Sequence, residues 1–143
     1  MRTSRVLPTL LLLLGACGGG PPSATAVAGE LHISNGFAYE PIIPASGAAY
    51  LTITNDGTTP DTLMEVSSPA AAGAMLHASS MGHLMALPIP AGGTVALEPG
   101  GTHIMFSDFS EVPKAGDSLS VTLVFARTGS VSLRLPVRKY GDK

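Results

Sequence analysis

Short apolar or alternating runs, separated by turn residues, most constrain what this chain can fold into. The runs cover residues 31–34, 48–54, 62–67, 74–77, 84–89, 94–98, 102–106, 119–125 and 131–137. Turn signals such as Asn55-Asp56-Gly57 and Pro99-Gly100-Gly101 lie between them. Short strands divided by such turns are typical of an antiparallel β-sandwich or Greek-key barrel. No segment shows the period of a long amphipathic helix, so the sequence predicts an all-β Greek-key β-sandwich of about eight or nine strands.

The N-terminus has the features of a bacterial lipoprotein signal. Arg2 and Arg5 supply a positive start, and residues 6–14 form an apolar stretch too short to span a bilayer. The stretch ends in Leu14-Gly15-Ala16-Cys17, which has the form of a lipobox, and Cys17 is the only cysteine of the chain. We therefore expect residues 1–16 to be removed, Cys17 to be lipidated, and the protein to be exported and anchored to a membrane, facing the periplasm or the cell exterior.

The remaining chain divides into a linker and one domain. Residues 17–29 are rich in Gly, Pro, Ser and Ala, a composition typical of a flexible tether. Residues 30–140 are long enough for one domain with one hydrophobic core. Loss of the two signal arginines changes the formal net charge from −2 to about −4. A mildly acidic domain without a run of basic residues lacks the positive surface that binds nucleic acid.

Several enzyme motifs are missing from the sequence. It contains no Gly-x-Ser-x-Gly nucleophile motif, no phosphate-binding glycine loop that leads into a helix, and no pair of acids beside a histidine. We therefore expect a binding protein and not an enzyme.

Methionine and histidine gather in one window, residues 75–105. Apart from Met1 the chain has five methionines and four histidines, and this window holds four of the former and three of the latter. No charged residue lies between Glu65 and Glu98. Thioether sulfur is a soft neutral ligand and imidazole an intermediate one, so together they suit Cu(I). The window lacks the carboxylates of a Ca²⁺ or Mg²⁺ site and the thiolates of a structural zinc site.

The spacing of these residues favours ligands over core filling. On a strand, His103 and Met105 leave the same face, while Ile104 leaves the other face toward the core. The same alternation at Met75-Leu76-His77 would point Leu76 inward. Two such strands can bring their outward histidines and methionines together.

These residues resemble the metal motif of the periplasmic copper chaperones called PCu(A)C, in which a His, ten residues, a Met, twenty-one residues and His-x-Met follow one another. Twenty-one residues separate Met81 from His103, and Met105 completes His-x-Met. Only three residues separate His77 from Met81, so the first hairpin departs from the family pattern. The resemblance implies a ligand set of His77, Met81, His103 and Met105, and leaves Met85 and His83 as possible alternates.

The resemblance also implies a fold and a function. Members of the family have a cupredoxin-like β-sandwich, bind Cu(I) and deliver it to a partner, such as the CuA subunit of cytochrome c oxidase during its assembly, or to another copper acceptor. The alternative is a non-metal, immunoglobulin-like envelope lipoprotein, in which Met and His serve only packing. The sequence does not decide between Met81 and Met85, between delivery and sequestration, or between one membrane and another.

Overall fold

A computed structural model describes residues 20–79 and 82–142 of the chain. Within these ranges the structure is all-β, and no described helix is long and apolar enough to cross a membrane. The described residues form eleven strands: β1 (Ala24–Ala28), β2 (Leu31–Tyr39), β3 (Ser46–Asn55), β4 (Asp61–Ser67), β5 (Ala71–Ala78), β6 (Gly82–Leu84), β7 (Leu87–Ile89), β8 (Thr94–Leu97), β9 (His103–Phe109), β10 (Ser118–Phe125) and β11 (Gly129–Arg138).

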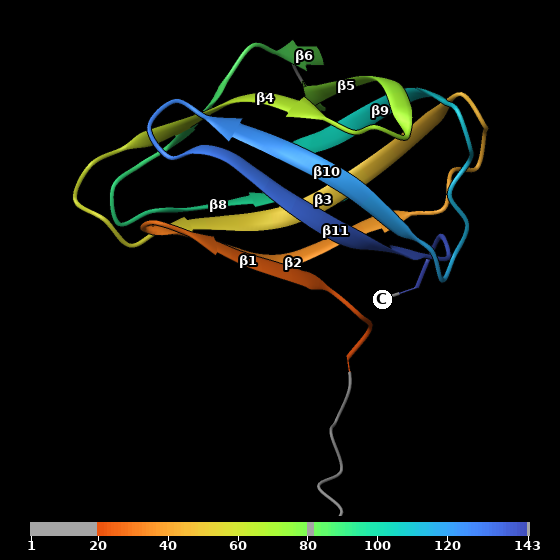
Figure 1. The fold of residues 1–143 in the computed structure, drawn as a ribbon, viewed down its shortest axis with the longest axis horizontal. Helices are drawn as coiled ribbons and strands as arrows, with labels where there is room; N and C mark the ends of the chain where they lie inside the picture. The colour runs from red at the N-terminus through yellow and green to blue at the C-terminus, as the bar shows by residue number, and fades with distance from the viewer. Residues whose placement is uncertain (1–19, 80–81, 143) are drawn as a thin grey trace, which may run out of the picture.

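The strands follow one another in the order β6-β5-β9-β3-β2-β11-β10-β4-β7, with β1 added to β2 and β8 added to β3. All pairs are antiparallel except β11 with β2. The path curls over, so that β10 and β11 cross in front of β3 (Figure 1). This arrangement confirms the all-β sandwich.

The strand number exceeds the expected eight or nine. The run 84–89 was expected as one strand, but it is divided between two strands with different partners. β6 pairs with β5, whereas β7 pairs with β4, so the chain crosses from one partner to the other. Met85 lies at this crossing and is 80% exposed. A periodic pattern cannot reveal the crossing, because both halves of the run are apolar.

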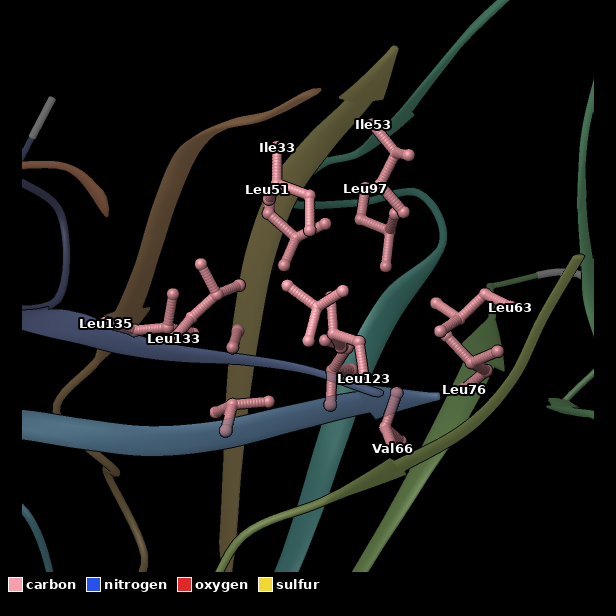
Figure 2. Close-up of a cluster of buried hydrophobic side chains, with 14 of the residues drawn as sticks. Ile33, Leu51, Ile53, Leu63, Val66, Leu76, Leu97, Leu123, Leu133 and Leu135 are labelled. Carbon is pink, nitrogen blue, oxygen red and sulfur yellow. The ribbon is translucent and has the colours of Figure 1, made fainter. Parts of the chain in front are cut away.

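The curled path forms two facing layers, one that contains β2, β3 and β8 and one that contains β4, β10 and β11, and the hydrophobic core fills the space between them. Side chains from β2, β3 and β8 meet those from β4, β10 and β11 there (Figure 2). The expected runs 119–125 and 131–137 form a C-terminal hairpin, because β10 pairs with β11 and places Leu123 opposite Val131. Its inward residues are Leu119, Val121, Leu123, Phe125, Val131, Leu133, Leu135 and Val137, all at most 7% exposed.

The tether expected over residues 17–29 is wrong for its last part, because β1 pairs with β2 and belongs to the folded unit. Alanines made this segment resemble a linker, yet Ala24, Ala26 and Ala28 pack against the core as partly buried residues. The chain before β1 is held as well, since the Nη2 group of Arg138 donates a hydrogen bond of 2.7 Å to the carbonyl of Pro22. Residues 1–19, with the predicted signal and Cys17, lie outside the described residues.

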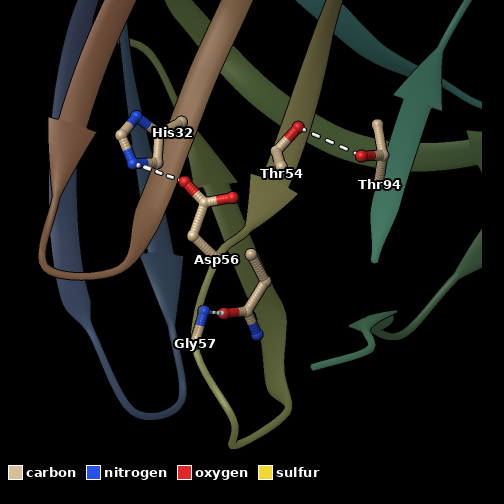
Figure 3. Close-up of polar contacts among 6 residues, drawn as sticks. His32, Thr54, Asp56, Gly57 and Thr94 are labelled. Atoms are coloured by element: carbon tan, nitrogen blue, oxygen red, sulfur yellow. Dashed lines mark hydrogen bonds and ion pairs between the residues drawn. The ribbon is translucent and has the colours of Figure 1, made fainter. Parts of the chain in front are cut away.

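The turn from β3 to β4 is built as the Asn55-Asp56-Gly57 motif predicted. Asn55 is 1% exposed; its Oδ1 accepts a hydrogen bond from the amide of Gly57 at 3.0 Å, and its Nδ2 donates to the carbonyl of Thr59 at 2.9 Å. His32 reaches the same turn and lies 2.9 Å from the carboxylate of Asp56 (Figure 3). His32 is thus an exposed residue of β2, whereas the other three histidines lie on β5, β6 and β9.

Asp61, a buried carboxylate, is the first residue of β4 and stabilises the end of the β3–β4 turn. Its oxygens accept hydrogen bonds from the amides of Thr62, Arg127 and Thr128 and from the Thr128 hydroxyl, at 2.6 to 3.1 Å. Burial alone would raise the pKa of Asp61, but these hydrogen bonds outweigh it and lower that pKa. The charged carboxylate therefore ties the start of β4 to the loop between β10 and β11.

Candidate metal site

The structure pairs the two strands that carry most of the candidate ligands. Strands β5 and β9 are antiparallel neighbours, with His77 opposite His103 and Met75 opposite Met105. The intervening residues point into the core: Leu76 is 3% exposed and Ile104 is fully buried. Directly opposed residues share a face of the sheet, so the two histidines and two methionines lie together on the outer face.

The two imidazole rings lie close together, with centroids 5.1 Å apart. The Nδ1 atom of His103 is 2.9 Å from the carbonyl oxygen of Gly101. Because a carbonyl oxygen only accepts, this contact places the hydrogen on Nδ1 and leaves the lone pair of Nε2 for another partner. A backbone carbonyl behind one ring nitrogen is the usual way to orient a metal-binding histidine.

His77 differs from His103, because its Nδ1 is buried and has no hydrogen-bond partner among the described residues. An unpaired buried polar atom costs about 1–3 kcal/mol, so such atoms are rare and often mark an ion or a functional site. An unpartnered ring nitrogen beside His103 is what a histidine awaiting a metal ion would show.

A shallow apolar hollow of about 230 Å³ borders the site, and both His103 and Met105 contribute to its lining. Tyr50 lies beside His103, with ring centroids 6.2 Å apart, and makes an edge-to-face contact with Tyr39. Burial raises the pKa of Tyr50, and the neighbouring Tyr39 and Tyr140 raise it further. Tyr50 therefore stays neutral near neutral pH and adds no charge to the site.

The other residues singled out in the sequence are placed as follows. Met81 lies outside the described residues. His83 stands opposite His77 on β6 but is exposed. Met85 lies beyond β6 and lines a separate hollow. No group of three or more His, Cys, Asp or Glu suited to a metal ion occurs in residues 20–79 and 82–142.

Met75 belongs to this face as well, although the family pattern gives it no role. Its position opposite Met105 depends on the register of β5 against β9. The alternation Met75-Leu76-His77 was the signal that could have pointed to it.

Comparison with known proteins decides the family. Residues 31–137 match the family model described as "Putative lipoprotein LpqE-like". The chain belongs to this family. One relative of the LpqE-like chain, "Putative lipoprotein Lxx21020" of Leifsonia xyli subsp. xyli (strain CTCB07), is 32% identical over 101 residues. The match covers 65% of the LpqE-like chain and 61% of that relative, so the chain spans about three fifths of the relative's length.

Solved structures share the fold of the LpqE-like chain. The copper-bound PCuAC domain from PmoF2 matches with a TM-score of 0.74 and 24% identity, over 80% of this chain and 97% of that domain. The Cu(I) form of DR1885 from Deinococcus radiodurans matches with a TM-score of 0.63 and 25% identity, over 82% of this chain and 83% of the other. These matches confirm the predicted resemblance to PCu(A)C domains and the cupredoxin-like fold.

Proposed function

We propose that this LpqE-like lipoprotein binds Cu(I) on the outer face of β5 and β9 and passes it to an acceptor protein in the cell envelope. The observation that carries the proposal is the pair His77 and His103, which combines one oriented imidazole with one buried, unpartnered nitrogen. Support comes from the shared fold, since one matching structure is a copper-bound domain and another a Cu(I) form.

The proposed ligands are His77, His103, Met105 and Met81. The first three lie on two paired strands of the sheet. Met81 joins the set by the spacing of the family motif, because twenty-one residues separate it from His103 in the sequence. Two thioethers and two neutral imidazoles give a soft, uncharged ligand set, which suits Cu(I) better than a divalent hard ion.

Exchangeable ligands favour delivery over storage, because methionine and histidine hold copper less firmly than a buried set of thiolates. By family resemblance, the acceptor would be the CuA subunit of cytochrome c oxidase or another copper protein of the envelope. The function needs no catalytic step.

The anchor forms the second part of the proposal. We place a lipid on Cys17, in agreement with the lipoprotein description of the family. Strand β1, where the folded unit begins, lies on the opposite side of the molecule from β5 and β6 (Figure 1). A lipid at Cys17 would therefore leave the metal face turned away from the attachment point, accessible to a partner.

A competition titration tests this function. The full chain, with Cys17→Ser in every sample so that no thiol competes, is titrated anaerobically with Cu(I) against a chelator. We expect one tightly bound equivalent, and His77→Ala or His103→Ala should weaken it by at least about tenfold, the lower end of what loss of even an outer-shell partner costs. His32→Ala is the matched control, since the exposed side chain of His32 on β2 lies against Asp56 in the β3–β4 turn, outside the β5–β9 face. Failure to take up one equivalent would favour the non-metal envelope module.

A further inference from the structure

A second cluster of soft donors lies where β4, β5 and β6 meet, and it adjoins the first site because its His83 stands opposite His77. A hollow of about 170 Å³ opens there between β4, β5 and β6. Its lining includes three methionines and one histidine: Met64, Met75, Met85 and His83. Of the methionines that the structure describes, only Met105 is absent from this lining.

Packing does not explain these methionines. Met64 is 50% exposed and Met85 is 80% exposed, although methionine is ordinarily a core residue. Met64 lies at an irregularity of β4, where Leu63 and Glu65 pair with consecutive residues of β10 and leave Met64 as the extra residue. A bulge of this kind turns a side chain away from its regular direction and is frequent beside functional sites.

The polar groups of the hollow favour a cation. His83 contributes an exposed imidazole, and Glu65 contributes the one carboxylate of the lining. No lysine or arginine lies among the lining residues. A carboxylate near a cation lowers its energy without supplying the several oxygens that a hard ion requires.

We propose that this hollow is a second, weaker site for Cu(I), with Met64, Met85 and His83 as its ligands. Met75 links it to the first site, because it lines the hollow and also stands opposite Met105 on β9. Copper that enters at the hollow would then move along methionine sulfurs to His77 and His103. This inference shares its metal with the proposed function but none of its ligands, so each can fail alone.

The test follows methionine methyl groups by NMR while Ag(I), a redox-stable stand-in for Cu(I), is added to the full chain carrying Cys17→Ser. We expect the Met105 methyl to shift with the first equivalent, and the Met64 and Met85 methyls with the second. Met64→Leu with Met85→Leu keeps side-chain volume nearly constant and should abolish the second equivalent while the first remains.

The reciprocal variant separates the two proposals. His103→Ala with Met105→Leu should abolish the first equivalent and leave the shifts of Met64 and Met85 intact. If the Met64 and Met85 methyls stay unmoved in excess Ag(I), or if Met64→Leu with Met85→Leu still takes up two equivalents, the second site is wrong. If those methyls shift but Met105 never does, the second site stands and the proposed ligand set of the first site fails.

Discussion

His77 and His103 face each other across β5 and β9, with ring centroids 5.1 Å apart and different hydrogen-bonding states. His103 is oriented by the carbonyl of Gly101, whereas the buried Nδ1 of His77 lacks a partner among the described residues. Loss of either ring should therefore weaken Cu(I) binding for a different reason: His103→Ala removes a ring oriented by a backbone carbonyl, and His77→Ala removes a ring whose buried Nδ1 has no hydrogen-bond partner among the described residues.

Proton competition gives a prediction that separates the ligand types. A proton competes with a metal for imidazole nitrogen but not for thioether sulfur. Cu(I) affinity should fall as the solution is acidified, and His103→Ala should reduce both the affinity and this dependence. Met105→Leu should lower the affinity and leave the pH dependence in place. Competition titrations at several pH values give the comparison, and equal pH profiles for both variants would contradict it.

Substitution of two adjacent residues of β9 should affect different properties: fold stability for Ile104 and Cu(I) binding for Met105. Ile104 is fully buried, so Ile104→Ala should lower the free energy of unfolding by about 2–5 kcal/mol. Met105→Leu keeps nearly the same volume on the outer face and should cost less than about 1.5 kcal/mol while it weakens Cu(I) binding. Chemical denaturation of the metal-free variants measures the first effect. A Met105→Leu variant as unstable as Ile104→Ala would show that Met105 serves the core.

Asp61→Asn should destabilise the fold by about 1–3 kcal/mol near neutral pH, because an amide NH₂ cannot accept the hydrogen bonds that the carboxylate accepts. The folded-state pKa of Asp61 is lowered, so its contribution is present above the unfolded value of about 3.9 and is lost as pH falls through the folded value. The wild type should therefore lose more stability than Asp61→Asn between pH 6 and pH 3, values that bracket the ordinary carboxylate pKa of about 4. Chemical denaturation at both pH values measures this difference. An equal loss of stability in the wild type and in Asp61→Asn would contradict the stabilising role of the Asp61 carboxylate.

Gly82 begins β6 with a φ of +70°, a backbone conformation in which a side chain is strained. Gly82→Ala should cost about 1 kcal/mol and weaken Cu(I) binding, because the β5–β6 hairpin carries His77. Gly20→Ala is the control outside the site, because nothing lies within 4 Å of its added Cβ. Equal losses in the two variants would remove this special role of Gly82.

Cys17→Ser should release the protein from the membrane fraction and leave the domain folded, because the described fold begins several residues later, at β1. Detergent-phase partitioning measures the change. Wild-type mature protein found in the soluble fraction would contradict the anchor.

The sequence predicted those features that depend on local alternation. The β10–β11 hairpin and the inward direction of Leu76 and Ile104 follow from a period of two. Strand β1 was missed because alternate alanines pack against the core without a strong apolar signal. The crossing at Met85 and the position of Met75 depend on which strands become neighbours, which no local pattern contains.

X-ray absorption at the copper edge tests the central claim most directly. The full chain with Cys17→Ser is loaded with one equivalent of Cu(I), and the scatterers around the metal are identified. We predict both imidazole nitrogen and thioether sulfur, with nitrogen scattering reduced in His77→Ala and in His103→Ala and unchanged in His32→Ala. A spectrum without sulfur, or one that neither histidine variant alters, would contradict the assignment of Cu(I) to the face of β5 and β9.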